Sequence, residues 1–222
     1  IGQQLREAPD GQVSLTDPDA RSMKNRDGGI VGYNVQAAVD AQHHLIVAHE
    51  VVTDGIDRDQ LAPMAERARD ATGISALTVV ADRGYFKSEQ ILQCDEAGIT
   101  PLVPKSMTSN SRAEGRFDKQ DFMYIASDDE YRCPAGQRAI KRFTTIERGM
   151  TLHKYWSSAC PRCALKAQCT TGDYRRIARW EHEAVLEAMQ LRLDRQPEMM
   201  RVRRQTVEHP FGTIKAWTGP CH

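Results

Sequence analysis

The sequence contains 222 residues, of which 40% are hydrophobic and 27% are charged, an ordinary composition for a protein that buries a core. No apolar run approaches the roughly 18 residues that span a bilayer, and the start has no signal-peptide pattern. Membrane and secreted classes are therefore excluded, and we expect a cytoplasmic protein. The chain begins at Ile1 and stops at His222 without an obvious closing element, so we also expect a fragment of a longer protein.

The net charge is zero, but the two signs are unevenly distributed along the chain. Residues 1–131 carry 13 basic and 22 acidic side chains, whereas residues 132–222 carry 17 basic and 8 acidic ones. This asymmetry indicates a polyanionic partner for the basic part. Two solvated surfaces of opposite sign would give the same composition.

The chain opens with a polar stretch, residues 1–28, that has no sustained period and is typical of a linker or loop. Residues 30–40 then alternate apolar and polar side chains, as a half-buried strand does. Residues 45–52 form a second, β-branched run. Because a short polar turn separates the two runs, we expect them to pair as a hairpin.

The next segments alternate between helical and strand patterns. Residues 59–72 have apolar side chains at helical spacing, and Gly73 is a natural stop. Residues 77–82 form a short apolar run that ends in a carboxylate, residues 87–96 are again helical, and residues 100–104 resemble another strand. This order indicates an α/β layer fold.

The second half is less regular. Residues 106–131 are polar and resemble a surface loop, whereas residues 180–195 regain helical spacing before Pro197 interrupts it. We divide the chain into a linker or loop (1–28), the first part of a catalytic core (29–105), a cysteine-bearing insertion (106–179) and the final helical part of the core (180–222).

Two carboxylates stand at the ends of predicted strands. Asp40 ends the first strand, and Asp82 ends the run of residues 77–82. Sites in α/β sheets lie outside the carboxyl ends of strands, and Mg²⁺ prefers oxygen ligands and often uses only one or two protein carboxylates. A third carboxylate from a distant segment would complete a two-metal site for attack at phosphorus. Strand-end aspartates also occur simply as caps and strand terminators.

Three motifs resemble those of DDE transposases from bacterial insertion sequences. Residues 79–85 read VVADRGY, which resembles the second-aspartate motif, and residues 32–40 read GYNVQAAVD, which is similar to the first-aspartate strand. Residues 204–215 fit the R-x3-E-x6-K part of the family signature, with Arg204, Glu208 and Lys215 in the named positions. The resemblance extends from about residue 30 to residue 215.

The resemblance implies an RNase H-like catalytic core that binds two Mg²⁺ or Mn²⁺ ions through Asp40, Asp82 and Glu208. The ions would activate water and then a DNA 3′-hydroxyl for attack on a phosphodiester. Residues four and seven apart share a helical face, so Arg204 and Lys215 would contact phosphate oxygens beside Glu208. We expect a homo-oligomer acting on transposon ends and target DNA.

The sequence departs from the family pattern at two positions, and two other functions stay open. The family's tyrosine is Arg201 here, and Pro210 lies between Glu208 and Lys215, where it would kink or restart a helix. The alternatives are an RNase H-like nuclease or domesticated relative without strand transfer, and a non-catalytic, zinc-bearing DNA-binding remnant.

A cysteine cluster lies in the insertion. Cys160 and Cys163 form a C-x2-C pair, and Cys133 and Cys169 can complete a four-thiolate zinc site. Grouped cysteines in a cytosolic protein favour metal over disulfides, and such a site would stabilise a polar insertion. His153 is an alternative ligand, and reduced free thiols are the other interpretation. The remaining cysteines, Cys94 and Cys221, resemble isolated thiols.

The insertion also interleaves basic and aromatic residues, which suits contacts to DNA strands. The same aromatics would otherwise form the core of this small unit. The basic residues are Lys141, Arg142, Lys154, Arg162, Lys166, Arg175, Arg176 and Arg179, and the aromatic ones are Phe143, Tyr155, Trp156, Tyr174 and Trp180.

Overall fold

The structure is a computed structural model that describes residues 6, 11–25, 28–105 and 111–218. It divides into two compact units, which we treat separately. Unit 1 contains Ile1–Ser106 and Val185–His222, and unit 2 contains Met107–Ala184. None of the described helices is long and apolar enough to cross a membrane.

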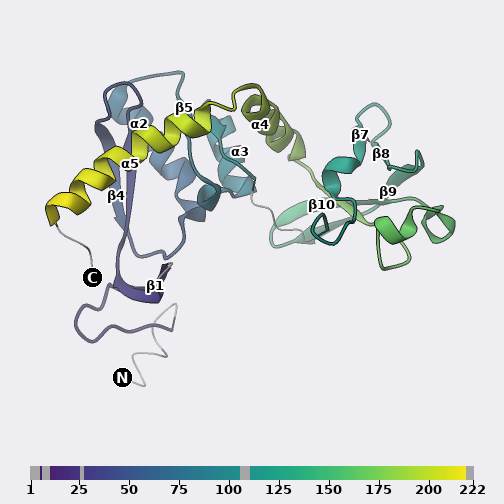
Figure 1. The fold of residues 1–222 in the computed structure, drawn as a ribbon, viewed down its shortest axis with the longest axis horizontal. Helices are drawn as coiled ribbons and strands as arrows, with labels where there is room; N and C mark the ends of the chain where they lie inside the picture. The colour runs from purple at the N-terminus through teal and green to yellow at the C-terminus, as the bar shows by residue number, and fades with distance from the viewer. Residues whose placement is uncertain (1–5, 7–10, 26–27, 106–110, 219–222) are drawn as a thin grey trace. The chain divides into compact units, whose positions relative to one another are not determined.

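Unit 1 is a mixed α/β unit (Figure 1). Its strands pair two by two: β1 with β2 and β3 with β4 are antiparallel, whereas β5 and β6 are parallel. Helix α5 packs against both β3 and β5. The elements are β1 (Arg21–Asn25), β2 (Gly28–Gly32), β3 (Asn34–Val39), β4 (Ile46–Val52), α2 (Leu61–Thr72), β5 (Thr78–Val80), α3 (Ser88–Glu96), β6 (Thr100–Leu102), α4 (Glu183–Arg195, whose first residues belong to unit 2) and α5 (Met199–Thr218).

Helix α2 shows how the sequence pattern produces the core of unit 1. Its apolar side chains Leu61, Met64 and Ala68 recur at helical spacing and are buried. The backbone N–H of Ala62, in the first turn, donates to the side-chain oxygen of Gln90 on α3 at 2.9 Å. The helix ends at Gly73, whose φ of 66° lies in the left-handed region that glycine adopts without strain.

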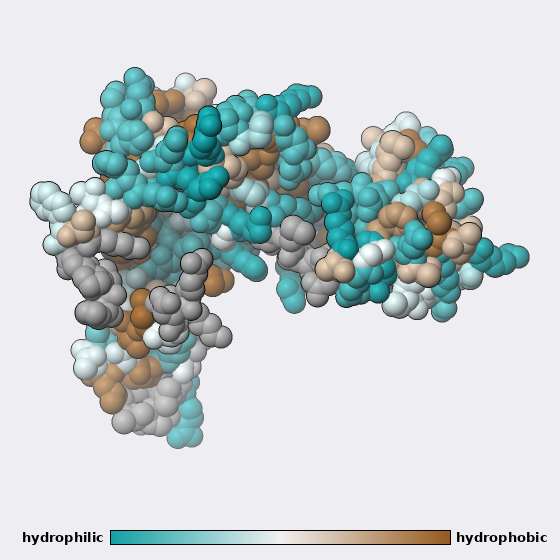
Figure 2. Space-filling model, in the orientation of Figure 1, coloured by the Kyte–Doolittle hydropathy of each residue, from teal (hydrophilic) through white to brown (hydrophobic). Residues whose placement is uncertain are grey.

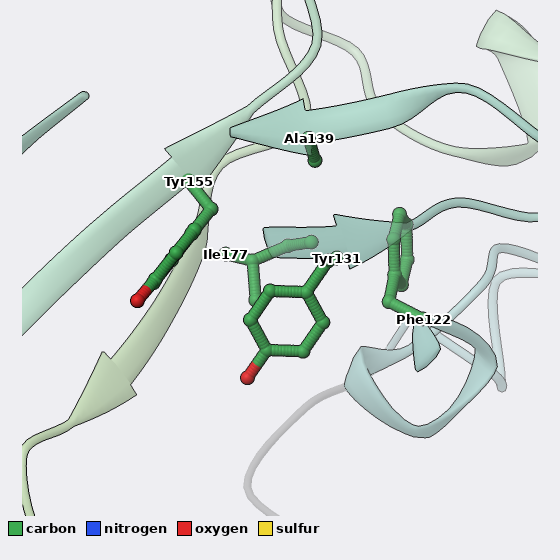
Figure 3. Close-up of a cluster of buried hydrophobic side chains, with 5 residues drawn as sticks. All are labelled: Phe122, Tyr131, Ala139, Tyr155 and Ile177. Carbon is green, nitrogen blue, oxygen red and sulfur yellow. The ribbon is translucent and has the colours of Figure 1, made fainter. Parts of the chain in front are cut away.

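Unit 2 is built on a five-stranded antiparallel sheet with the order β11-β10-β9-β8-β7. Its core contains Phe122, Tyr131, Ala139, Tyr155 and Ile177 (Figure 3). The rings of Tyr131 and Tyr155 meet edge to face at 5.2 Å between centroids, a favourable aromatic arrangement. The strands are β7 (Met123–Ile125), β8 (Glu130–Arg132), β9 (Arg138–Glu147), β10 (Met150–Trp156) and β11 (Ile177–Trp180).

Four local predictions from the sequence need correction. The stretch expected to be a linker, residues 1–28, contains β1, because Met23 is buried there and the backbone pairs with β2. The strand expected over residues 30–40 divides at Tyr33 into the end of β2 and β3. The stretch expected to be a surface loop, residues 106–131, contains β7 and β8. The sequence predicts a kink or restart at Pro210, whereas helix α5 continues through this residue, which is buried.

Candidate active site

Asp40 follows β3 at a tight turn that its own carboxylate stabilises. The carboxylate accepts the backbone N–H groups of Gln42 at 3.1 Å and His43 at 2.9 Å, and the Nδ1 atom of His43 lies 2.5 Å from it. These contacts, the Gln42 N–H first and the His43 side chain next, hold the pKa of Asp40 below its ordinary value. Asp40 is therefore an ionised, oriented carboxylate at the end of the strand.

Asp82 is fixed in a different way, through the short helical turn that follows β5. Its Oδ1 atom accepts the backbone N–H of Gly84 at 2.7 Å and thereby caps the 3-10 helix Arg83–Tyr85. Its Oδ2 atom accepts a hydrogen bond from Nη2 of Arg203, on α5, at 2.9 Å. Both carboxylate oxygens of Asp82 are thus held, one by a neighbouring backbone N–H and the other by an arginine that is far away in the sequence.

The glycine of the Asp-Arg-Gly-Tyr segment has a steric explanation. A Cβ atom at Gly84 would lie 2.9 Å from Oδ1 of Asp82 and 3.5 Å from Oδ2 of Asp57. The first distance is shorter than real Cβ contacts allow, so any side chain at position 84 displaces the Asp82 carboxylate. Glycine is required here for a close approach and not for its backbone freedom.

The tyrosine of the same segment connects the two aspartate-bearing strands. The Tyr85 hydroxyl donates to the side-chain oxygen of Gln36 on β3, and the Gln36 side chain is buried, with 2% exposed. The Gln36 amide in turn donates to Oδ1 of Asn34 at 2.9 Å and to Oδ1 of Asp57 at 2.7 Å. Burial, with the charges of Asp57 and Asp82, raises the pKa of Tyr85, so its hydroxyl stays protonated and acts as the donor.

Asp40 and Asp82 line one cavity of about 290 Å³. Its walls are formed by β3, β5 and α2 together with one face of α5. The α5 residues that face it are Met199, Val202, Arg203, Thr206 and Val207.

Two of the other predicted site residues stand outside the described lining of this cavity. Arg204 and Glu208 are exposed on α5, each one residue beyond a lining residue and therefore turned by about 100° around the helix axis. The residue after Glu208, His209, has its ring 5.8 Å from that of His44 in the turn after Asp40. The side chain of Lys215 lies outside the described part of the chain.

Within the described residues, no three His, Cys, Asp or Glu side chains are placed to hold a metal ion. Each aspartate contacts a basic side chain instead: His43 lies against Asp40, and Arg203 occupies Oδ2 of Asp82. Sequence reasoning missed Arg203 because it selected the neighbouring Arg204 by motif position.

The four cysteines of the insertion surround one small cavity in unit 2. Cys133, Cys160, Cys163 and Cys169 all line a space of about 30 Å³, and none of them is in a disulfide. Burial raises the pKa of the Cys169 thiol. The candidate alternative ligand His153 lies instead on β10, where its Nδ1 atom contacts the hydroxyl of Thr144 at 2.9 Å. In the structure as described, the four thiols share a cavity without the arrangement of a metal site.

Comparison with known proteins gives a match to a family model. The family model described as a transposase DDE domain matches residues 7–219, which is nearly the whole chain. No curated protein and no solved structure matches the sequence.

Proposed function

We propose, from the premise that this chain belongs to the transposase DDE domain family, that Asp40, Asp82 and Glu208 bind divalent metal ions for DNA cleavage and strand transfer. The observation that carries this proposal is the shared cavity of Asp40 and Asp82, which the sequence separates widely and the fold brings to one site. The partner is DNA, at the ends of the mobile element and at its target.

The donor chemistry of the site suits the metals that the family implies. Carboxylate oxygens are the ligands that Mg²⁺ and Mn²⁺ prefer. Asp40 is held ionised by its turn, and Asp82 is held by Gly84 and Arg203. A bound divalent ion would supply activation of a water or 3′-hydroxyl and stabilisation of the leaving oxygen. Glu208 is the proposed third ligand by its position in the family motif, since its exposed side chain on α5 is outside the described lining of the cavity.

Basic side chains on α5 have two proposed tasks. Arg203 balances the charge of Asp82 and holds this carboxylate at the cavity. Arg204 is exposed next to it, which leaves its planar guanidinium able to contact phosphate oxygens of DNA. Lys215 is proposed to contact phosphate by its position in the motif alone.

The experiment is metal-dependent cleavage of labelled DNA from the ends of the element, with and without a target duplex. Asp40→Asn, Asp82→Asn and Glu208→Gln should each lower cleavage by at least a hundredfold while the variants stay folded and bind DNA. The matched control is Asp70→Asn, an exposed aspartate on α2 away from the cavity lining, which should retain wild-type activity.

The products separate the proposal from its alternatives. Joined strands in the reaction with target DNA support transposition, whereas cleavage without joining supports an RNase H-like nuclease. Cleavage that persists in all three variants would show that the site is assigned wrongly. A folded wild-type protein that binds DNA but never cleaves it would indicate a non-catalytic remnant.

We also propose a structural zinc ion in unit 2, held by Cys133, Cys160, Cys163 and Cys169. The supporting observation is that thiols from three separate segments line one small cavity. Zinc measured in protein purified without chelators should approach one ion per chain, and Cys163→Ser should lower it, whereas Cys94→Ser should not. A folded, reduced protein without zinc would contradict this part.

A further inference from the structure

Three aromatic side chains contact one another on the surface of unit 2 and take no part in its core. The ring of Trp156, at the end of β10, lies 5.9 Å from Phe143 on β9 and 6.1 Å from Tyr174 in the segment before β11. Phe143 is 49% exposed and Tyr174 is 37% exposed, although both are large rings. Figure 2 shows hydrophobic and hydrophilic residues mixed on the visible face of this unit.

Two arginines lie over the central ring. The guanidinium carbon of Arg142 is 5.5 Å from the centroid of Trp156, and that of Arg176 is 5.7 Å from it. Arg142 is further oriented by Ser158, whose hydroxyl accepts a hydrogen bond from Nη2 at 2.6 Å. We call these five residues, Arg142, Phe143, Trp156, Tyr174 and Arg176, the aromatic–arginine patch.

The core of unit 2 does not explain the patch. Tyr131, Tyr155 and Ile177 fill the core, and the Tyr155 hydroxyl donates to Asp129 at 2.5 Å. Trp156 contacts the other two rings and the two arginines instead, and the exposed rings of Phe143 and Tyr174 leave apolar faces open to a partner. Unit 2 also has an excess of basic over acidic residues, 14 against 10 in residues 107–184, which favours an anionic partner.

We infer that the aromatic–arginine patch binds single-stranded DNA, with bases stacked on Phe143 and Tyr174 and phosphates held by Arg142 and Arg176. An unpaired strand exposes the faces of its bases, whereas a duplex hides them in its own stack. The arginines supply the phosphate contacts that every such strand offers. This inference rests on the proposed function, in which DNA is the partner of the chain.

The test measures the affinity of the whole chain for a short oligothymidine and for a duplex of equal length, by fluorescence anisotropy at matched salt. The chain carries Asp82→Asn, so that cleavage plays no part. Base stacking contributes about 1–3 kcal/mol per base, so Phe143→Leu with Tyr174→Leu should weaken oligothymidine binding by roughly 30-fold or more and duplex binding by less than threefold. Leucine keeps an apolar side chain at each position without a ring on which a base can stack, and circular dichroism confirms that the double variant is folded.

Two further variants sharpen the result. Arg142→Gln with Arg176→Gln should reduce the salt dependence of oligothymidine binding by roughly 1.4 in the logarithmic slope, for two phosphates. Ile146→Ala, at an exposed position on the same strand β9, is the control and should leave affinity unchanged.

The inference is overturned if the leucine variants bind oligothymidine as the parent does, or if duplex and single strand lose affinity equally. It is also overturned if the substitutions change only the association of the chain with itself or with another protein. These results are separate from the proposed function, because cleavage is measured through Asp82 in unit 1. If the chain cleaves DNA normally but its affinity for oligothymidine does not depend on the patch, this inference is refuted and the proposed function is not.

Discussion

Replacing Gly84 with alanine isolates the positioning of Asp82 from every other property of the site. The new Cβ atom would lie 2.9 Å from Oδ1 of Asp82, where ordinary contacts begin at 3.4 Å, so the carboxylate must move. The backbone of Gly84 is not in the left-handed region, so alanine adds no backbone strain there. The perturbation is therefore confined to one carboxylate.

Gly84→Ala should change both the free energy of unfolding, through two opposing contributions, and the cleavage rate, through displacement of the Asp82 carboxylate. Weakening the cap between Asp82 and the Gly84 N–H costs about 0.5–2 kcal/mol, whereas replacing glycine restricts the unfolded chain and returns about 0.4–1 kcal/mol. Stability should thus fall by about 1 kcal/mol or less. A carboxylate shifted by about half an ångström should lower the cleavage rate by roughly tenfold, since misplacement by 1 Å reaches about a hundredfold.

The assay compares cleavage rates at saturating Mg²⁺ with urea unfolding of the same preparations. Gly32→Ala is the matched control, because a Cβ atom there meets nothing within 4 Å, and it should leave the cleavage rate unchanged. A Gly84→Ala protein with wild-type cleavage would refute the argument that this glycine exists to admit the Asp82 carboxylate.

Three other outcomes follow from the same contacts. Tyr85→Phe leaves the buried oxygen of Gln36 without its donor and should lower the free energy of unfolding by about 1–3 kcal/mol in urea titrations. The control Tyr33→Phe loses an exposed hydrogen bond to Asp17 and should change this free energy by less than about 0.5 kcal/mol. Equal effects of the two substitutions would contradict the buried network. Burial raises the pKa of Cys94 to about 12, so this thiol should stay protonated at pH 8 in the native state and should not react with a disulfide reagent. Rapid labelling of Cys94, measured by mass spectrometry, would contradict its burial. Because the pKa of Asp40 is lowered in the folded state, the contribution of Asp40 to stability is present above its unfolded-state pKa and is lost as the pH falls through its folded-state pKa. His43→Ala should raise the folded-state pKa of Asp40 in an NMR titration. An unchanged pKa would contradict the contact between His43 and Asp40.

The elements of unit 1 that the sequence predicts best are those with a strong local pattern. Helix α2 has apolar residues at helical spacing and a glycine stop, and β5 is a short apolar run. β1 escaped prediction because its strand character depends on pairing with β2 and on one buried residue, Met23. Local pattern carries no information about such a partner.

The site shows the same division between local and long-range information. Asp40 and Asp82 are selected by their positions at strand ends, and their role as metal ligands stays a prediction. The contact of Arg203 with Asp82 depends on how α5 is rotated about its axis. The sequence motif does not determine this rotation, so it cannot tell which of the neighbouring residues Arg203 and Arg204 faces Asp82. The hydrogen bond between Tyr85 and Gln36 joins residues far apart in the chain, so it could be identified only from the tertiary structure.

The most direct measurement of the central claim places iron at the proposed metal site. Fe²⁺ bound in place of Mg²⁺, with ascorbate and peroxide, generates radicals that cut the nearby backbone, and the fragments are located by mass spectrometry. The account predicts cuts next to residues 40, 82 and 208, suppressed by excess Mg²⁺ and absent from Asp82→Asn. Cuts elsewhere in unit 1, or the same cuts in Asp82→Asn, would contradict a metal site built on these three carboxylates.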